Sequence, residues 1–140
     1  IGNERLQTFP VWELFFDNLP PGSNPIATER AKWDRDYQLR AGIATGPAEN
    51  LPEALARHIA HIAKRSYRAL HLSGYARLDL RLTEDGRVYV IEANPNPDIR
   101  REEDFAASAA AAGLSYPQLL QRLLNLGLRH RSPWKALEEA

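Results

Sequence analysis

The stretch from Tyr75 to Asp98 constrains this chain most, because it has the pattern of a β-hairpin with one apolar face and one charged face. Apolar and charged residues alternate strictly in its first half, as in a half-buried strand. Asp85-Gly86 follows, and this dipeptide is the strongest short turn signal, because both central residues of a type I′ turn need positive φ. We therefore predict two antiparallel strands joined by a two-residue loop.

A two-residue loop fixes which side chains face each other across this hairpin. Asp79 falls opposite Glu92, and Arg77 falls opposite Asn94. The reverse face collects five apolar side chains, namely Leu78, Leu80, Leu82, Tyr89 and Ile91. A three-residue bulged loop would shift the register and break this alignment. The prediction that the two carboxylates meet therefore depends on the turn.

Two carboxylates directly opposite each other on a sheet repel, so they need a compensating cation. Arg77 could provide part of that charge, but a divalent metal fits better. Mg²⁺ prefers hard oxygen ligands, and this face offers them from Asp79, Glu92 and Asn94. The alternative is a solvated outer face with cross-strand ion pairs, which is common on antiparallel sheets. The residue pattern by itself leaves both interpretations open.

Four motifs occur in an order that resembles a known family. They are A-K-W-D-R-D-Y at residues 31–37, G-Y-A-R-L-D-L-R at 74–81, V-I-E-A-N-P-N-P at 90–97 and A-A-A-G-L-S-Y-P-Q-L-L at 110–120. Together they resemble the carboxy-terminal part of an ATP-grasp ligase of the D-alanine–D-alanine ligase type. The resemblance covers most of residues 2–128.

This resemblance implies an α+β fold, with an antiparallel sheet and helices packed on one side, that forms the C-terminal lobe of an ATP-grasp domain. It implies an ADP-forming ligase that joins a small-molecule carboxylate to an amine through an acyl phosphate, with ATP and Mg²⁺ or Mn²⁺. Asp79, Glu92 and Asn94 match the metal ligands of the family. Arg77 matches the cation that stabilises the tetrahedral intermediate, and Lys32 matches a phosphate-binding lysine on a loop that closes over the site.

The segment after the hairpin departs from the family pattern. Family members usually continue E-x-N with a small residue, Pro, Gly and a Ser-bearing loop that receives the substrate carboxylate. Here Asp98 stands where the glycine is expected, and the next serine is Ser108. Arg100 or Arg101 is the candidate for binding an anionic substrate instead, although exposed arginines near a helix start are more often only solvated. The resemblance therefore leaves open whether D-alanine is the substrate.

Composition excludes several other classes of protein. The 140 residues include 18 basic and 18 acidic side chains, so the chain carries no basic footprint for nucleic acid. No apolar run approaches the ~18 residues of a transmembrane helix. The absence of Cys excludes disulfides and thiolate metal sites. We expect a cytoplasmic protein without a nucleic-acid or membrane partner, and a homodimer is left open.

The chain begins at Ile1 and contains no Met, so we expect a piece of a longer protein in which the N-terminal lobe of the ATP-grasp domain is missing. Residues 1–130 would form the C-terminal part of that domain, and residues 131–140 a tail. Two alternatives remain for its function. One is a non-catalytic ATP-grasp remnant that serves as a binding or assembly module. The other is a metal-dependent phosphodiesterase, against which the balanced charge counts.

Periodicity and turn residues predict the other elements. We expect strands over residues 5–9 and 11–16, loops over 18–28 and 42–50, and helices over 51–70, 102–112 and 115–129. Asn50 with Glu53, and Ser115 with Gln118, are candidate capping boxes. Gly113 is expected to follow a helix end in the left-handed conformation.

Overall fold

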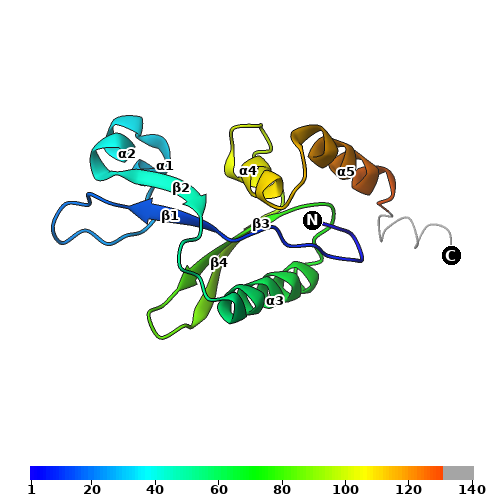
Figure 1. The fold of residues 1–140 in the computed structure, drawn as a ribbon, viewed down its shortest axis with the longest axis horizontal. Helices are drawn as coiled ribbons and strands as arrows, with labels where there is room; N and C mark the ends of the chain where they lie inside the picture. Colours follow the sequence, from blue (N-terminus) through cyan, green and yellow to red (C-terminus); the bar gives the residue numbers. More distant parts are fainter. Residues whose placement is uncertain (131–140) are drawn as a thin grey trace. The chain divides into compact units, whose positions relative to one another are not determined.

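A computed structural model describes residues 1–130, apart from the side chains of Lys32 and Trp33 (Figure 1). The predicted tail over 131–140 lies outside the described residues. The elements, in order, are β1 (Trp12–Phe16), α1 (Glu29–Trp33), α2 (Arg35–Ala41), β2 (Ile43–Pro47), α3 (Glu53–Ala69), β3 (Arg77–Leu82), β4 (Val88–Asn94), α4 (Asp104–Ala111) and α5 (Tyr116–Leu128). None of the helices in the described part is long and apolar enough to span a membrane.

The α+β fold class is confirmed, but in the described residues the strands form two antiparallel pairs instead of one sheet. The chain divides into two compact units. One contains residues 10–50, and the other contains residues 1–9 together with 51–130. The predicted break at Pro10 therefore marks a boundary between units. The candidate metal ligands all belong to the second of these units.

The unit of residues 10–50 consists of β1, β2 and the two short helices between them. The predicted loop over 18–28 is confirmed, because these residues contain neither helix nor strand. The predicted loop over 42–50 is wrong, since β2 pairs with β1 and Thr45 faces Leu14. Two β-branched residues, Ile43 and Thr45, favour this strand. This strand could not be predicted from residues 42–50 alone, because its partner β1 is distant in the sequence.

Residues 5–9 do not form the predicted strand. The backbone of this segment bonds to a neighbouring part of the chain instead of to a strand: Gln7 N–H donates to Ile1 O at 2.9 Å. Just before it, Gly2 N–H donates to Gly74 O at 2.7 Å. Residues 6–9 are half-buried, but no strand in the described part of the chain pairs with them.

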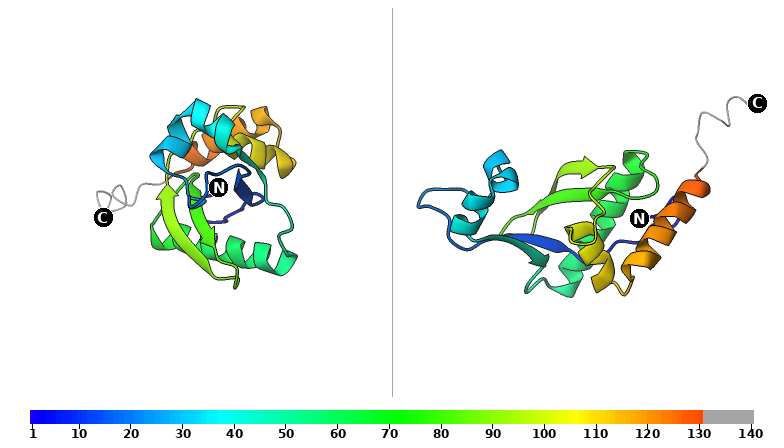
Figure 2. Two further views of the ribbon diagram at one scale, coloured as in Figure 1. Left: turned by 90° about the vertical axis from the view of Figure 1, so that its left-hand side faces the viewer. Right: turned by 90° about the horizontal axis from the view of Figure 1, so that it is seen from above.

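The helix α3 lies beside the hairpin of β3 and β4 in both views (Figure 1, Figure 2). Ile59 and Tyr67 are buried on its inner side, and the Tyr67 hydroxyl donates to Gly2 O at 2.9 Å. Burial raises the pKa of Tyr67 to about 12, so the hydroxyl keeps its proton. The predicted capping box is wrong, because Pro52 occupies the N-cap and Asn50 has a φ of 52°.

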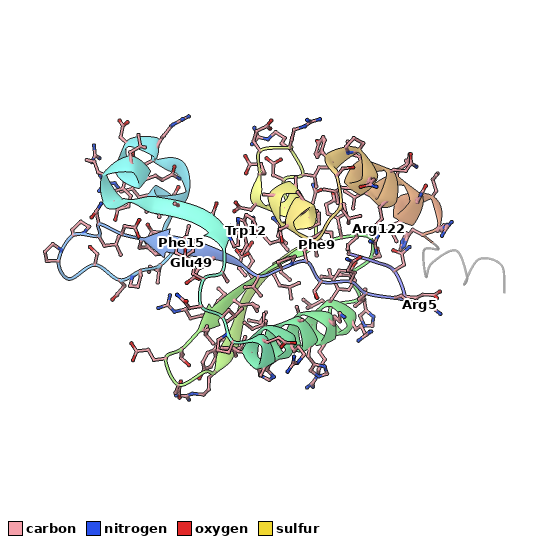
Figure 3. All side chains as sticks on the ribbon, viewed as in Figure 1. Arg5, Phe9, Trp12, Phe15, Glu49 and Arg122 are labelled. Atoms are coloured by element: carbon pink, nitrogen blue, oxygen red, sulfur yellow. The ribbon has the colours of Figure 1, made fainter. Side chains whose placement is uncertain are left out.

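The helices α4 and α5 build the core of this unit. The buried cluster consists of Ile1, Phe105, Ala106, Ala109 and Leu119. The ring of Phe9, which is labelled in Figure 3, packs edge-on against Phe105, with ring centroids 5.6 Å apart. Both end signals predicted here are confirmed. Gly113 follows α4 with a φ of 83°, and Ser115 N–H donates to Gln118 Oε1 at 2.8 Å at the start of α5.

Replacing Leu119 with alanine is expected to lower the free energy of unfolding by about 2–5 kcal/mol, because this side chain is fully buried and its removal leaves a cavity. Denaturant unfolding of the wild type and the variant measures the change. Leu124→Ala is a matched control on the exposed side of the same helix, with an expected loss within about 1 kcal/mol. Equal losses for the two variants would contradict the core assignment.

Candidate functional site

The candidate site lies on one face of the hairpin of β3 and β4. Asp79 faces Glu92 across the ladder, and Arg77 faces Asn94. Residues directly opposite each other on a sheet point to the same side, and alternate residues of one strand do so too. The four side chains therefore share one face, and both predicted facing pairs are confirmed.

The loop that joins the two strands differs from the predicted one. Thr83 N–H donates to Arg87 O at 2.9 Å, and Gly86 N–H donates to Thr83 O at 2.9 Å. This pattern leaves Glu84, Asp85 and Gly86 in the loop, with Gly86 at a φ of 80°. The two-residue type I′ turn is therefore wrong. The chain instead uses a three-residue loop, which places its single left-handed residue at the glycine.

A β-bulge compensates for the longer loop. On the turn side, Leu80 faces Val90, which is one position off the predicted pairing. The register then shifts between Asp79 and Leu80, so Asp79 still faces Glu92. Ile91 is the extra residue on β4. Without the bulge, the three-residue loop would move Asp79 out of register with Glu92. With the bulge, the two residues still face each other.

The bulge also changes the composition of the apolar face. Val90 and Val88 face Leu80 and Leu82, in place of the predicted Ile91 and Tyr89. Tyr89 instead faces Arg81. The prediction that Tyr89 and Ile91 share the leucine face is therefore wrong. Both of these side chains are exposed.

Arg77 binds the Asp79 carboxylate with two hydrogen bonds. The Nε to Oδ1 distance is 2.7 Å, and the Nη2 to Oδ2 distance is 3.1 Å. The hydrogen bond to Asp79 raises the pKa of Arg77 above its usual value, and the nearby charges of Glu92 and Asp104 add to this effect. Arg77 is therefore a fixed cation. It provides part of the compensating charge expected for the two facing carboxylates.

The side chains on this face carry oxygens of the kind that hard divalent cations prefer. Asn94 Oδ1 accepts a hydrogen bond from Asn96 N–H at 2.9 Å, and a carbonyl oxygen has a second lone pair for a ligand. In the described part of the chain, no three His, Cys, Asp or Glu side chains gather into a metal site. Asp79 and Glu92 would therefore need Asn94, water or ligand oxygens to complete the coordination. Mg²⁺ is typically bound in this way, through one or two carboxylates.

Lys32 belongs to the other unit of the chain. Its backbone lies in α1, which begins after the N-cap Thr28, where Thr28 Oγ1 accepts the Ala31 N–H at 3.1 Å. Its side chain is outside the described residues. The role of Lys32 at the nucleotide therefore stays a prediction.

The two arginines after the hairpin are engaged with protein groups. Arg100 Nε donates to Asp98 Oδ2 at 2.9 Å, and Arg100 Nη2 donates to Glu103 Oε1 at 3.0 Å. The side chain and the backbone N–H of Arg100, which both donate to Asp98, hold the pKa of this carboxyl below its usual value. The Arg101 guanidinium stacks 4.9 Å from the centroid of the Tyr116 ring. This geometry favours a role in holding the segment over capture of an anionic substrate.

One polar pair beside the site was not recognised in the sequence. The Tyr75 hydroxyl donates to Asn96 Oδ1 at 2.9 Å. The predicted register could have revealed this pair. Extending the Arg77–Asn94 pairing by two residues places Tyr75 opposite Asn96.

Comparison with curated proteins shows relatives in one family. The chain is 34% identical over 128 residues to a D-alanine–D-alanine ligase of Desulfotalea psychrophila, covering 91% of this chain and 37% of the relative. It is 40% identical over 94 residues to the vancomycin C-type resistance protein VanC2 of Enterococcus casseliflavus, covering 67% and 27%. The chain thus spans about a third of the length of these relatives.

Solved structures show the same similarity. The D-alanine–D-alanine ligase of Bacillus anthracis complexed with ATP is 32% identical, with a TM-score of 0.57, over 61% of this chain and 30% of that protein. A second structure of the ligase from this organism has a TM-score of 0.61 at 24% identity, over 84% and 34%, and supports the fold alone. The family profile "D-ala D-ala ligase C-terminus" matches residues 25–125. The chain therefore belongs to the D-alanine–D-alanine ligase C-terminal family, whose fold is that of the ATP-grasp ligases.

Proposed function

We propose that this chain is the C-terminal part of an ATP- and Mg²⁺-dependent ligase that joins a carboxylate to an amine through an acyl phosphate. The observation that supports this most is the hairpin face, where Asp79 lies opposite Glu92 and Arg77 opposite Asn94. The named relatives are D-alanine–D-alanine ligases, and one solved relative is complexed with ATP. Use of ATP favours a cytoplasmic location.

Asp79, Glu92 and Asn94 are the proposed metal ligands. A bound Mg²⁺ or Mn²⁺ would neutralise charge on the β- and γ-phosphate oxygens of ATP during transfer. Two carboxylates and one amide oxygen suit this purpose, because they hold the cation while leaving positions for phosphate oxygens. Lys32 is proposed to bind phosphates of the nucleotide, as a compact charge on a flexible stem.

Arg77 is the proposed stabiliser of charge on the tetrahedral intermediate that forms when the amine attacks. Its contact with Asp79 fixes the guanidinium and keeps it protonated. A preorganised donor of this kind lowers the barrier because it does not have to reorient during the reaction. Arg77 also has N–H groups that Asp79 does not use, since a guanidinium carries five donors.

The substrates are small carboxylates and amines, and D-alanine is one candidate among them. Asp98 and Arg100 bind each other in the segment where the family pattern places a serine-bearing loop. Because that segment differs, the specificity for the acceptor is expected to differ as well.

The test is nucleotide turnover by the full-length protein. We expect ADP release that requires both Mg²⁺ and an amino acid substrate, and that stops when EDTA removes the metal. Hydroxylamine should trap the acyl phosphate as a hydroxamate. Formation of AMP and pyrophosphate would contradict the acyl-phosphate route. Binding of ATP without turnover across a panel of amino acids would instead support a non-catalytic binding module.

A further inference from the structure

The polar face of the hairpin continues beyond the strands. Asp79 faces Glu92 and Arg77 faces Asn94, and the same register places Tyr75 opposite Asn96. These two side chains are joined by the hydrogen bond from the Tyr75 hydroxyl to Asn96 Oδ1, at 2.9 Å. The face therefore consists of two cross-strand pairs and, just beyond the ends of the strands, one hydrogen-bonded side-chain pair that has no role in the proposed chemistry.

The ring of Tyr75 is anchored in the core. It lies 5.6 Å from the ring of Phe105, measured between centroids, with an interplanar angle of 60°. Phe105 is buried and in turn packs against Phe9. Packing thus fixes the ring, and its hydroxyl has a defined position at the open end of the hairpin.

Asn96 connects this hydroxyl to Asn94. Its side chain accepts from Tyr75, and its backbone N–H donates to Asn94 Oδ1 at 2.9 Å. Pro95 and Pro97 flank Asn96, and each proline restricts the residue before it to extended geometry. Pro97 is also buried. The two prolines restrict the backbone of this turn. The hydrogen bond from Tyr75 also holds it against the segment that precedes β3.

We propose that Tyr75 and Asn96 are positioning residues, which hold the Asn94 side-chain oxygen in the orientation that a divalent cation requires. This inference rests on the proposed function, because it takes Asn94 as a metal ligand. The hydrogen bond from Asn96 N–H occupies one lone pair of Asn94 Oδ1 and fixes the direction of the other. Groups of this kind behind metal ligands commonly tune metal affinity.

The test measures Mn²⁺ affinity, and not only turnover, in the full-length protein. Free Mn²⁺ is followed by electron paramagnetic resonance in the presence of a non-hydrolysable ATP analogue, for the wild type, Tyr75→Phe, Asn96→Ala and the double variant. Each single variant is expected to weaken Mn²⁺ binding about 3- to 10-fold, the factor that one hydrogen bond typically contributes. The double variant should be no weaker than the worse single variant, because both remove the same link.

Two controls separate this role from a structural one. Tyr75→Phe keeps the ring against Phe105, so its thermal midpoint should stay close to that of the wild type. Tyr89→Phe removes a hydroxyl from the turn side of the bulge, where Tyr89 faces Arg81, and should leave Mn²⁺ affinity unchanged. A loss of thermal stability in Tyr75→Phe without a change in Mn²⁺ affinity would show that the hydroxyl is only structural and would overturn the proposal.

The variant Asp79→Asn distinguishes failure of this inference from failure of the proposed function. If Asp79→Asn loses Mn²⁺ while Tyr75→Phe binds it as the wild type does, the metal site stands and the positioning role is overturned. If Asp79→Asn binds Mn²⁺ as tightly as the wild type, the metal site is wrong and the positioning role falls with it. Additive losses in the double variant would also overturn the link, because they would show that the two side chains act separately.

Discussion

Replacing Glu92 with glutamine is expected to lower ADP release by the full-length protein at least about 10²-fold, and Asp79→Asn should do the same. Each change removes a charged oxygen ligand from a hard cation, and the charge stabilisation that a metal supplies in such reactions amounts to several kcal/mol. A difference of that size corresponds to two or more factors of ten in rate. The measurement is ADP release as a function of Mg²⁺ concentration.

The Mg²⁺ dependence is the diagnostic part of this experiment. Both variants should need more Mg²⁺ for half-maximal rate, and excess metal should restore part of the activity. Glu84→Gln is the control, because Glu84 is an exposed carboxylate in the loop of the same hairpin and should behave as the wild type. A Glu92→Gln variant with an unchanged Mg²⁺ requirement would remove this carboxylate from the metal site.

Arg77→Lys is expected to separate binding from chemistry. Nucleotide and metal should still bind, while product formation falls by about 10²-fold or more, the scale seen when one oxyanion donor is removed. Lysine keeps the charge but loses the planar fork, and that fork contacts both Asp79 oxygens here. ATP affinity and ligation rate, measured side by side with the carboxylate variants, provide the comparison.

A second ion pair in the hairpin supplies the control for Arg77. Arg87 pairs with Asp85 at 2.7 Å near the loop, with the same spacing of two residues, so Arg87→Lys should retain full activity. Full turnover in Arg77→Lys, while the carboxylate variants lose theirs, would show that Arg77 is only an ion-pair partner of Asp79. Such an exposed pair would then contribute about 0–1 kcal/mol to stability.

Local alternation on both strands predicted that Asp79 faces Glu92, and the structure confirms this pairing. The agreement also depended on the β-bulge, which compensates for the error in the predicted turn. The detail of the turn could not be predicted, because Asp85-Gly86 suits both a two-residue loop and the last two positions of a three-residue one. The choice between the two loops depends on which side chains pair across the ladder. In the structure, Val90 and Val88 face Leu80 and Leu82, where Ile91 and Tyr89 were expected.

The two errors in strand assignment have a common physical origin in partners that are distant in the sequence. β2 forms because β1 lies beside it, although its Gly and Pro residues are typical of a loop. Residues 5–9 have a strand-like pattern but make their contacts with other segments, such as the packing of Phe9 against Phe105. Two helix ends with local signals, at Gly113 and Ser115, were predicted correctly, whereas the capping-box signal at Asn50 was misleading because Pro52 occupies the N-cap.

The bulge at Ile91 determines where the hairpin can change length. A chain lacking Ile91 would have a regular ladder in which Leu80 still faces Val90 and Asp79 still faces Glu92, so a deletion there leaves the site in place. An insertion between Glu92 and Asn94 would instead turn one of the two proposed ligands to the apolar face, because successive residues alternate sides. The hairpin can therefore change in length at the bulge or toward the loop without disturbing the proposed site. A change in length between Glu92 and Asn94 would disrupt it.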